Sequence, residues 1–592
     1  MSDRTIYQVL RESVEKFGSR PALGYKRGKE YEYFTYQQVW ERVRAFRRGL
    51  TALGVKKGDR IALMSENRCE WAITDLAAQS LGVVTVAIYP TLPAPQVQHM
   101  IADSASRVFI VSDKKQLAKA LELRPNVRTL EHIVLMEGQT EEGVLSFDEV
   151  SERGKSSTIT DEELDAQAAT VSPDEVATLI YTSGTTGDPK GAMLSHKALL
   201  HTGYAARQIV KLDENDVFLS FLPLCHIIER VGGHYLPLSI GAQIVYSEGV
   251  FAIGNELASV RPTVFLCVPR LYENMQEKIA ETLAKRPEKE RKVAEWAISV
   301  GRACVDNKRA GKGIGPILAI KRAIADKLVL SKMREKTVGG RTRFFVTGGA
   351  PLNPETGAFF ESLGIRILEG YGLTEIPVVC LNRPENPVLG SVGPALPGME
   401  VKIAPDGEIL TRGVSLMRGY FGKPEATAES IDADGWFHTG DIGELGNGGV
   451  LKITDRKKDI IVLANGKNVA PQPIEAAIKF SPYIGEIVLI GDKQNSIVAI
   501  VVPAFDKLKA WARQQELPME PSELIKHAET RKLIKDEIDK HSKELADFEK
   551  VKRFSLTDSP FTIEGGELTP TLKVKRKFIA QKYSHLIEQL VK

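Results

Sequence analysis

The chain has 592 residues, of which 43% are hydrophobic and 26% charged, and its formal net charge is +3. This length exceeds one ordinary core, because domains usually span roughly 100–200 residues, so several globular units are expected. The near balance of charge gives no argument for nucleic acid as a partner. Five separated cysteines without a CxxC pair indicate reduced thiols in a cytoplasmic protein. The amino terminus lacks an apolar signal core, and the apolar stretch 81–92 is too short to span a membrane.

Strand-like and helix-like segments alternate along the chain. Residues 36–54 have apolar positions at helical spacing, and residues 58–65 follow as a buried strand. A second helix and strand follow at 70–82 and 83–90. This alternation predicts the α/β class, with mostly parallel sheets and helices on both faces. Further strand-like segments of the series are 105–112, 261–269 and 342–349.

The clearest boundary between two units lies in the charged run TDRKKD at 454–459. This run follows a glycine-rich turn, GNGGV, and precedes a new strand-like segment, IIVLANG. About 135 residues lie beyond it, which is enough for a small second domain. We therefore expect one domain over residues 1–454 and a second over residues 455–592.

The segment YTSGTTGDPKGAMLSH at 181–196 is the strongest single motif. It follows a buried strand at an edge where α/β proteins place ligands. Its glycines allow backbone N–H groups to approach phosphate closely, and its hydroxyls and lysine add donors and positive charge. It lacks the Walker A spacing, so it predicts a different nucleotide-phosphate loop, with an unliganded polar loop as the alternative. The candidate residues are Thr182, Ser183, Gly184, Thr185, Thr186, Gly187 and Lys190.

This loop resembles the signature of the adenylate-forming superfamily, which includes acyl-CoA synthetases, firefly-type luciferases and adenylation domains of nonribosomal peptide synthetases. The resemblance implies a large N-terminal AMP-binding domain of doubly wound sheets with a small barrel-like subdomain. A small, mobile α+β C-terminal domain would follow it. Six further motifs occur in the family order: LPLCHIIER (222–230), GGAPL (348–352), EGYGLTE (369–375), WFHTGD (436–441), ITDRKKD (453–459) and LTPTLKVKRK (568–577).

Several segments are similar to the long-chain fatty acyl-CoA synthetases in particular. They are LPLCHIIER, RPTVFLCVPRLYE (261–273), NGKNVAPQPIE (465–475), TPTLK and a helical insertion between 281 and 340. The implied reaction converts a fatty acid and ATP, with Mg²⁺, to acyl-AMP and pyrophosphate, and then transfers the acyl group to coenzyme A.

Three alternatives remain open. One is an adenylate-forming enzyme that serves a carrier protein or releases the adenylate. The second is a CoA ligase for another carboxylic acid, and the third is a non-catalytic fatty-acid-binding protein. The sequence fixes neither chain-length preference nor oligomeric state.

Adenylation requires screening of phosphate charge and alignment of a weakly nucleophilic carboxylate. Glu375 is the candidate to hold Mg²⁺ beside the phosphates, and Thr374, the residue before it, is a further catalytic candidate. The resemblance places Lys573 between the substrate carboxylate and the α-phosphate. It assigns the ribose hydroxyls to Asp441 and the adenine ring to Tyr371. The alternative is a solvated basic run for Lys573 and a helix cap for Glu375. For Asp441 it is an ordinary turn aspartate, and for Tyr371 it is core packing. Further implied nucleotide-site residues are Gly349, Ala350, Pro351, Glu369, Gly370, Gly372, Ile453 and Arg456.

The remaining candidates concern the acyl group and coenzyme A. His226 is expected to line the gate between an acyl tunnel and the adenylate, with a buried core histidine as the alternative. Arg230 stands where some relatives have an aromatic gate residue, so no gate role is assigned to it. The resemblance implies a hinge at Asp455, about which the small domain rotates between the two half-reactions. It implies that Asn465, Gly466 and Lys467 then face coenzyme A.

The insertion at 281–340 carries 15 Lys or Arg against seven Asp or Glu. Within it, residues 317–333 place Leu and Ile on one helical face and basic residues on the other, as interfacial helices do. The insertion is therefore a candidate for peripheral contact of a cytoplasmic enzyme with the inner membrane surface. An amphipathic helix packed on its own domain is the alternative.

Overall fold

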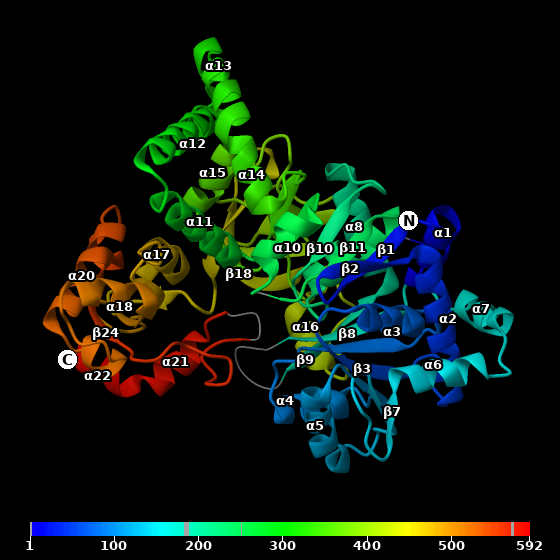
Figure 1. Cartoon of the computed structure of the whole chain (residues 1–592). Coiled ribbons are helices and arrows are strands. Elements are labelled where there is room, and N and C mark those ends of the chain that lie inside the picture. Colours follow the sequence, from blue (N-terminus) through cyan, green and yellow to red (C-terminus); the bar gives the residue numbers. More distant parts are fainter. Residues whose placement is uncertain (1–2, 183–188, 250, 570–572, 592) are drawn as a thin grey trace.

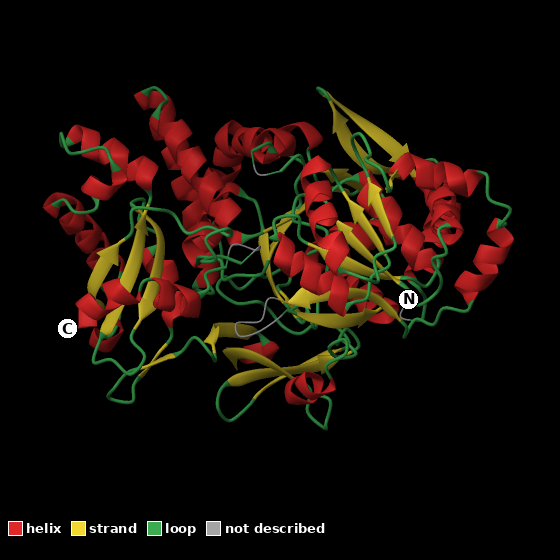
Figure 2. Ribbon diagram, turned by 90° about the horizontal axis from the view of Figure 1, so that it is seen from below, coloured by secondary structure: helices red, strands yellow, loops and turns green. Residues whose placement is uncertain are grey.

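A computed structural model describes residues 3–182, 189–249, 251–569 and 573–591. Two large sheets form the centre of the N-terminal part (Figures 1 and 2). The first has seven strands in the order β7-β6-β5-β3-β4-β8-β9, parallel except for the last pair. Its strands are β3 (Arg60–Met64), β4 (Val84–Ile88), β5 (Val108–Val111), β6 (His132–Leu135), β7 (Val144–Ser146), β8 (Val176–Thr182) and β9 (Lys190–Ser195).

The second sheet has eight strands in the order β15-β14-β13-β12-β10-β11-β1-β2. Its two outermost pairs are antiparallel and the others are parallel. The parallel, doubly wound arrangement expected from the alternating segments is confirmed. The strands are β1 (Pro21–Arg27), β2 (Glu30–Thr35), β10 (Val217–Ser220), β11 (Gln243–Tyr246), β12 (Val264–Cys267), β13 (Phe344–Thr347), β14 (Ile367–Tyr371) and β15 (Cys380–Leu381).

Helix α3 (Cys69–Ser80) lies between the two sheets, in contact with β4 of one and β1 of the other. All of its residues except Glu70 are buried, as expected for a helix covered on every side. This layer brings polar side chains of α3 into the centre of the molecule. The other helices around the sheets are α1 (Ile6–Phe17), α2 (Tyr36–Ala52), α4 (Ala94–Asp103), α5 (Lys114–Leu123), α6 (Phe147–Lys155), α7 (Asp161–Ala169), α8 (His196–Ile209), α9 (Leu236–Ile240), α10 (Ile253–Val260) and α15 (Pro354–Leu363).

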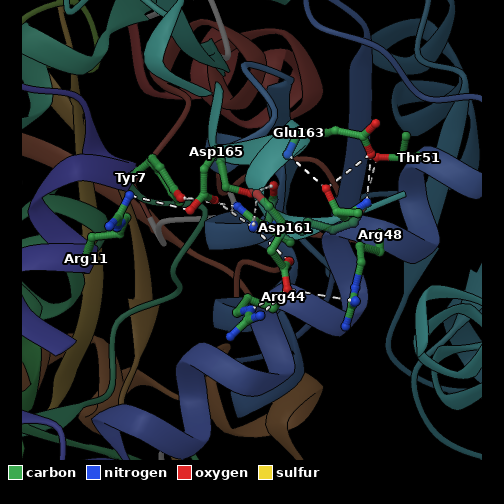
Figure 3. Close-up of polar contacts among 12 residues, drawn as sticks. Tyr7, Arg11, Arg44, Arg48, Thr51, Asp161, Glu163 and Asp165 are labelled. Carbon is green, nitrogen blue, oxygen red and sulfur yellow. Dashed lines mark hydrogen bonds and ion pairs between the residues drawn. The ribbon is translucent and has the colours of Figure 1, made fainter. Parts of the chain in front are cut away.

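Helices α1, α2 and α7 are joined by an ionic network (Figure 3). Asp161, in the first turn of α7, pairs with Arg44 and, at 2.8 Å, with the fully buried Arg47. Asp165 accepts a 2.5 Å hydrogen bond from the hydroxyl of Tyr7. Because Arg47 is withdrawn from water, its paired carboxylates are needed to offset its desolvation. The network fixes the edge of the fold that these three helices form.

A four-stranded antiparallel sheet follows the two large sheets, in the order β16-β17-β18-β19. It corresponds to the small subdomain expected after the doubly wound sheets. Its elements are β16 (Met399–Ile403), β17 (Glu408–Gly413), α16 (Pro424–Ser430), β18 (Phe437–Leu445) and β19 (Leu451–Arg456).

The insertion is helical, as the sequence predicts. Helix α13 projects from the body of the molecule at the top of Figure 1. Among the described residues, no helix combines the length and the apolar character needed to cross a membrane. Residues 281–340 comprise the last turn of α11 (Pro269–Ala284), α12 (Glu288–Arg309), α13 (Pro316–Ala325), the π-helical turn η3 (Asp326–Leu330) and α14 (Ser331–Val338).

The C-terminal part contains three hydrophobic clusters whose buried members all lie at or beyond Ile461. Among the described residues, one ion pair joins residues 458–592 to the preceding part of the chain, between Lys507 and Glu281. The elements are β20 (Ile461–Val462), β21 (Asn468–Val469), α17 (Pro471–Ile478), β22 (Ile484–Ile490), β23 (Ile497–Pro503), α18 (Phe505–Gln514), α19 (Pro521–Leu524), α20 (Ala528–His541), β24 (Val551–Leu556), α21 (Arg576–Lys582) and α22 (Ser584–Val591).

Candidate active site

The glycine-rich loop connects β8 and β9, which pair as an antiparallel hairpin with Thr182 opposite Lys190. The expected phosphate-loop residues Ser183, Gly184, Thr185, Thr186 and Gly187 lie outside the described residues. The hairpin positions the ammonium of Lys190 5.2 Å from the centre of the Tyr420 ring. The base of the loop is therefore fixed against the segment that precedes α16.

Tyr420 connects this hairpin to Glu375. The Tyr420 hydroxyl donates a 2.7 Å hydrogen bond to Oε1 of Glu375. Burial raises the pKa of the Glu375 carboxyl, while the hydrogen bond from Tyr420 opposes this effect. Thr374, the preceding residue, is partly exposed. One carboxylate is thus held beside the loop on which the sequence analysis places the phosphates.

A second cluster forms where β14, β18 and β19 meet. The Tyr371 hydroxyl donates a 2.6 Å hydrogen bond to Oδ2 of Asp441, and Nε of Arg456 lies 3.3 Å from Oδ1. Asp441 is buried, whereas 40% of the Arg456 side chain remains exposed. Burial raises the pKa of Asp441, and the positive charge of Arg456 opposes this shift. The nucleotide cluster, as we call Tyr371, Asp441, Arg456 and Lys573, therefore has an open side.

Lys573 joins this cluster from the C-terminal part of the chain. Burial lowers its pKa to about 8; the nearby charge of Arg456 lowers it further and that of Asp441 opposes this. His226, from the segment after β10, lies close enough to Lys573 to be affected by its charge. Burial lowers the pKa of His226 to about 4, and the charge of Lys573 adds to this effect. His226 is therefore neutral near pH 7, and the structure brings residues from five separate motifs together.

The turn after β14 depends on glycine. A Cβ at Gly372 would lie 1.9 Å from the carbonyl oxygen of Pro377, so only glycine fits there. The Glu369 side chain is buried, and its Oε1 accepts a 2.9 Å hydrogen bond from the backbone N–H of Gly390. Burial raises the pKa of Glu369 to about 7. Gly370 lies beside it in β14, opposite Leu381.

The loop after β13 contains Gly349, whose φ of 81° is a left-handed conformation suited to glycine. Ala350 and Pro351 are exposed. Ile453 lies in β19, opposite Gly443 of β18. These four residues have no charged or polar side chain. Any polar contact that they make with a nucleotide would come from their backbone.

Asp455 lies near the end of β19 and is buried. Its carboxylate accepts hydrogen bonds from the backbone N–H of Arg456 at 2.6 Å and of Gln472, in α17, at 3.4 Å. Burial raises the pKa of Asp455 to about 6. Asp455 therefore links the last strand of the small sheet to the first helix of the C-terminal part.

The turn Asn465–Gly466–Lys467 is not part of this cluster. It is exposed between β20 and β21, and the Lys467 ammonium lies 4.4 Å from the centre of the Phe548 ring. Tyr371, Asp441, Arg456 and Lys573 are thus close together in this arrangement, and the candidate coenzyme A turn lies elsewhere on the surface.

Two features of this region are not apparent from the motifs. Tyr420 reaches Glu375 because a β-bridge pairs it with Ala192, a contact that no local spacing reveals. Arg230 is fully buried and forms an ion pair with Asp75 of α3. Its guanidinium also donates to the hydroxyls of Thr178, at 2.7 Å, and Tyr235, at 3.0 Å. With these partners Arg230 has a structural role in the core.

Comparisons with known proteins identify the family. The model of the AMP-binding enzyme family matches residues 10–421, and that of the AMP-binding enzyme C-terminal domain matches residues 458–592. The chain is 35% identical to the long-chain-fatty-acid–CoA ligase FadD15 of Mycobacterium bovis, over 94% of this chain and 92% of the relative. It is 32% identical to the long-chain-fatty-acid–CoA ligase ACSBG2 of Homo sapiens, over 99% and 92% of the two chains.

A solved structure of similar fold is the adenylation domain of a carboxylate reductase from Mycobacterium chelonae. The TM-score is 0.76 and the identity 25%, with 99% of this chain and 91% of the other covered. The anthranilate CoA ligase AuaEII in complex with anthranoyl-AMP gives a TM-score of 0.75 at 21% identity, over 100% and 99% of the two chains.

Proposed function

The chain belongs to the AMP-binding enzyme family, and on this basis we propose that it is a long-chain fatty acid–CoA ligase. It activates a fatty acid with ATP to acyl-AMP and pyrophosphate, and then transfers the acyl group to coenzyme A with release of AMP. The observation that carries the proposal is the junction of Lys573 with the Tyr371–Asp441–Arg456 cluster. The two relatives compared above, each matched over more than nine-tenths of both chains, support the fatty acid as substrate.

In the first step a carboxylate oxygen attacks the α-phosphorus, and the bond to pyrophosphate breaks. Lys573, with a pKa of about 8, carries a positive charge near pH 7. Placed at the junction of the two anions, this ammonium stabilises the negative charge that accumulates in the transition state. Asp441 accepts hydrogen bonds from the ribose hydroxyls on its open side, while Tyr371 and Arg456 hold its carboxylate in place.

The residues present fit a magnesium ion at Glu375. Mg²⁺ in nucleotide sites is usually held by one or two carboxylates together with the substrate phosphates. Glu375 offers one such carboxylate, oriented by Tyr420 at the base of the glycine-rich loop. When bound, the ion would screen the charge of the phosphates. Lys190, whose ammonium lies beside the Tyr420 ring, adds a positive charge to this region.

The second step requires a different arrangement, because Lys573 occupies the place that the coenzyme A thiol must approach. We place the boundary between the mobile parts at residues 454–455, with Asp455 as the hinge. Its hydrogen bond to α17 and its position at the end of β19 support this assignment. Rotation about it would bring the exposed turn Asn465–Lys467 towards the reaction centre.

For its place in the cell, we propose a cytoplasmic enzyme that makes peripheral contact with the inner membrane surface through residues 281–340. Its substrate partitions into bilayers, which makes such a location chemically sensible. The excess of basic residues in the insertion supports attraction to an anionic surface.

The proposal is tested by product analysis with purified full-length protein, ATP, Mg²⁺ and free acids from about C6 to C24. Acyl-CoA and AMP should form in equal amounts with coenzyme A, with highest kcat/KM for the longer acids. Release of acyl-adenylate irrespective of coenzyme A would instead indicate another adenylate-forming enzyme. The matched pair of variants is Lys573→Ala and Lys577→Ala, since Lys577 is an exposed basic neighbour of the same segment.

A further inference from the structure

Helix α13 and the turn η3 present an apolar face to solvent. Large aliphatic side chains here are 45–72% exposed, far more than is usual for isoleucine and leucine. They recur at intervals of three, four and four residues, which places them on one side of the helix. The apolar stripe consists of Ile317, Ile320, Ile324 and Leu328.

The opposite side of the same helix is already packed. Ala325 is fully buried, and Arg322 donates a hydrogen bond to the carbonyl oxygen of Ser362 at the end of α15. Arg334 pairs with Asp326 at 2.6 Å and donates to the carbonyl oxygen of Leu363 at 2.7 Å. The rotation of the helix about its axis is thereby fixed, and the apolar stripe cannot turn inwards without breaking these bonds.

Basic side chains surround the stripe. Lys321 and Lys327 lie within the same turns as its members, and Lys312, Lys332 and Lys336 lie before and after it. All five lysines are exposed, and within the part of the chain that the structure describes none of them forms an ion pair. This differs from α12, where the exposed charges form pairs such as Lys292 with Glu288.

From this combination we infer that the projecting end of the insertion docks on an anionic lipid bilayer, with the apolar stripe inserted among the acyl chains. Interfacial helices combine an apolar face with lysines on the polar side. The aliphatic stems of these lysines lie along the apolar groups, so that the ammonium groups reach the lipid headgroups. Positive charge beside the stripe complements the negative surface of an anionic leaflet.

A second copy of the chain fits these observations less well. Stable protein interfaces involve about 20–30 residues on each side, and four aliphatic residues fall far short of that number. Two copies meeting at the stripe would also bring their unpaired lysines together. A bilayer needs neither a large complementary area nor opposite charges on another protein.

The test is co-sedimentation of the full chain with vesicles of phosphatidylcholine and phosphatidylglycerol, at low and at high salt. We expect binding at low salt, and weaker binding at high salt and to vesicles of phosphatidylcholine alone. The triple variant Ile317→Ser, Ile320→Ser, Ile324→Ser should abolish binding. The double variant Lys321→Gln, Lys327→Gln should weaken the partition coefficient about 10- to 30-fold, since each basic residue contributes about 1 kcal/mol.

The matched control is Val388→Ser with Val414→Ser, which removes two exposed aliphatic side chains elsewhere on the molecule and should leave binding unchanged. Absence of binding by the unmodified chain at low salt overturns the inference. So does a dimer, seen by sedimentation velocity, that the isoleucine triple variant dissociates. Ligation of a short, water-soluble acid tests the proposed function, and every one of these variants should leave it unaffected. A failure of the membrane proposal can therefore be distinguished from a failure of the proposed function.

Discussion

Two parts of the molecule are built around the same three residue types. In the nucleotide cluster, Asp441 accepts a hydrogen bond from Tyr371 and pairs with Arg456. In the buried arginine cluster, as we call Asp75, Thr178, Arg230 and Tyr235, Asp75 accepts a 2.6 Å hydrogen bond from Tyr235 and pairs with Arg230. The contacts of the two aspartates are nearly alike, but their surroundings are not.

The difference lies in exposure and in the number of donors. Asp75 and Arg230 are both 0% exposed, and Asp75 also accepts from Thr85 at 2.9 Å and from Gln79 at 3.3 Å. Arg456 is 40% exposed and Asp441 7% exposed, so the open side of this cluster lies at the guanidinium. The same ionic contacts are thus fully enclosed in one cluster and partly open to solvent in the other.

The largest effect is expected from Asp75→Ala. It would leave the buried Arg230 without its charge partner, and breaking such a pair typically reduces stability by about 3–5 kcal/mol. Asp441→Ala is the matched comparison: Arg456 can turn to water and only the Tyr371 hydroxyl loses its buried partner, so stability should fall by a smaller amount, about 1–2 kcal/mol. Denaturant unfolding of the two variants measures both values, and similar losses would contradict the distinction between the two clusters.

Lys573→Ala should change catalysis where Asp75→Ala changes stability. Removal of one preorganised charge commonly reduces the rate by about 10²–10³-fold. We expect that loss in ATP–pyrophosphate exchange, and little loss in thioester formation from preformed acyl-adenylate. Lys577→Ala should leave both rates unchanged. Equal damage to the two half-reactions would argue against separate arrangements for them.

The pH dependence of adenylation tests whether the positive charge of Lys573 is needed for this step. Lys573 keeps its proton below a pKa of about 8, so kcat/KM for exchange should be steady near pH 7 and decline about tenfold per unit well above pH 8. In Lys573→Arg the guanidinium stays charged, so any residual activity should lose this alkaline decline. A decline that persists in the arginine variant would have to come from another group.

The smallest effect is expected from Glu229→Gln, beside the buried arginine cluster. Burial raises the pKa of Glu229 from 4.5 to about 8, so the carboxyl is uncharged near pH 7 and an amide replaces it closely. The folded state binds this proton more tightly than the unfolded state. Its contribution to stability is therefore complete below pH 4.5 and lost as pH rises through about 8. The variant should lack that loss, which thermal unfolding between pH 5 and pH 9 would reveal.

The sequence predicted the α/β architecture because strand and helix periods alternate clearly from residue 36 onwards. It also placed Lys573, Asp441, Arg456 and Tyr371 in one site by their motifs, and the structure brings these residues together. Tyr420 was missed because its contact with Glu375 depends on pairing between segments more than 200 residues apart.

The role of Arg230 and the orientation of the insertion helix could not be predicted from the sequence, for the same reason. Arg230 was left without a role because its partners Asp75 and Thr178 come from a different helix and a different strand. For residues 317–333 the helical period was evident, but the direction of the apolar face was not. That direction is set by the carbonyl groups of Ser362 and Leu363, which no local pattern contains.

The ion pair between Lys507 and Glu281 bears on the equilibrium between the two arrangements proposed for the C-terminal part of the chain. Both side chains are more than a third exposed, and a pair of this kind contributes about 0–1 kcal/mol and is screened by salt. Such a contribution changes an equilibrium by no more than about fivefold, whereas reversing a population from 1:99 to 99:1 takes about 5.5 kcal/mol. The direction of each rotation would then be decided by ATP, adenylate and coenzyme A, through their unequal affinities for the two arrangements.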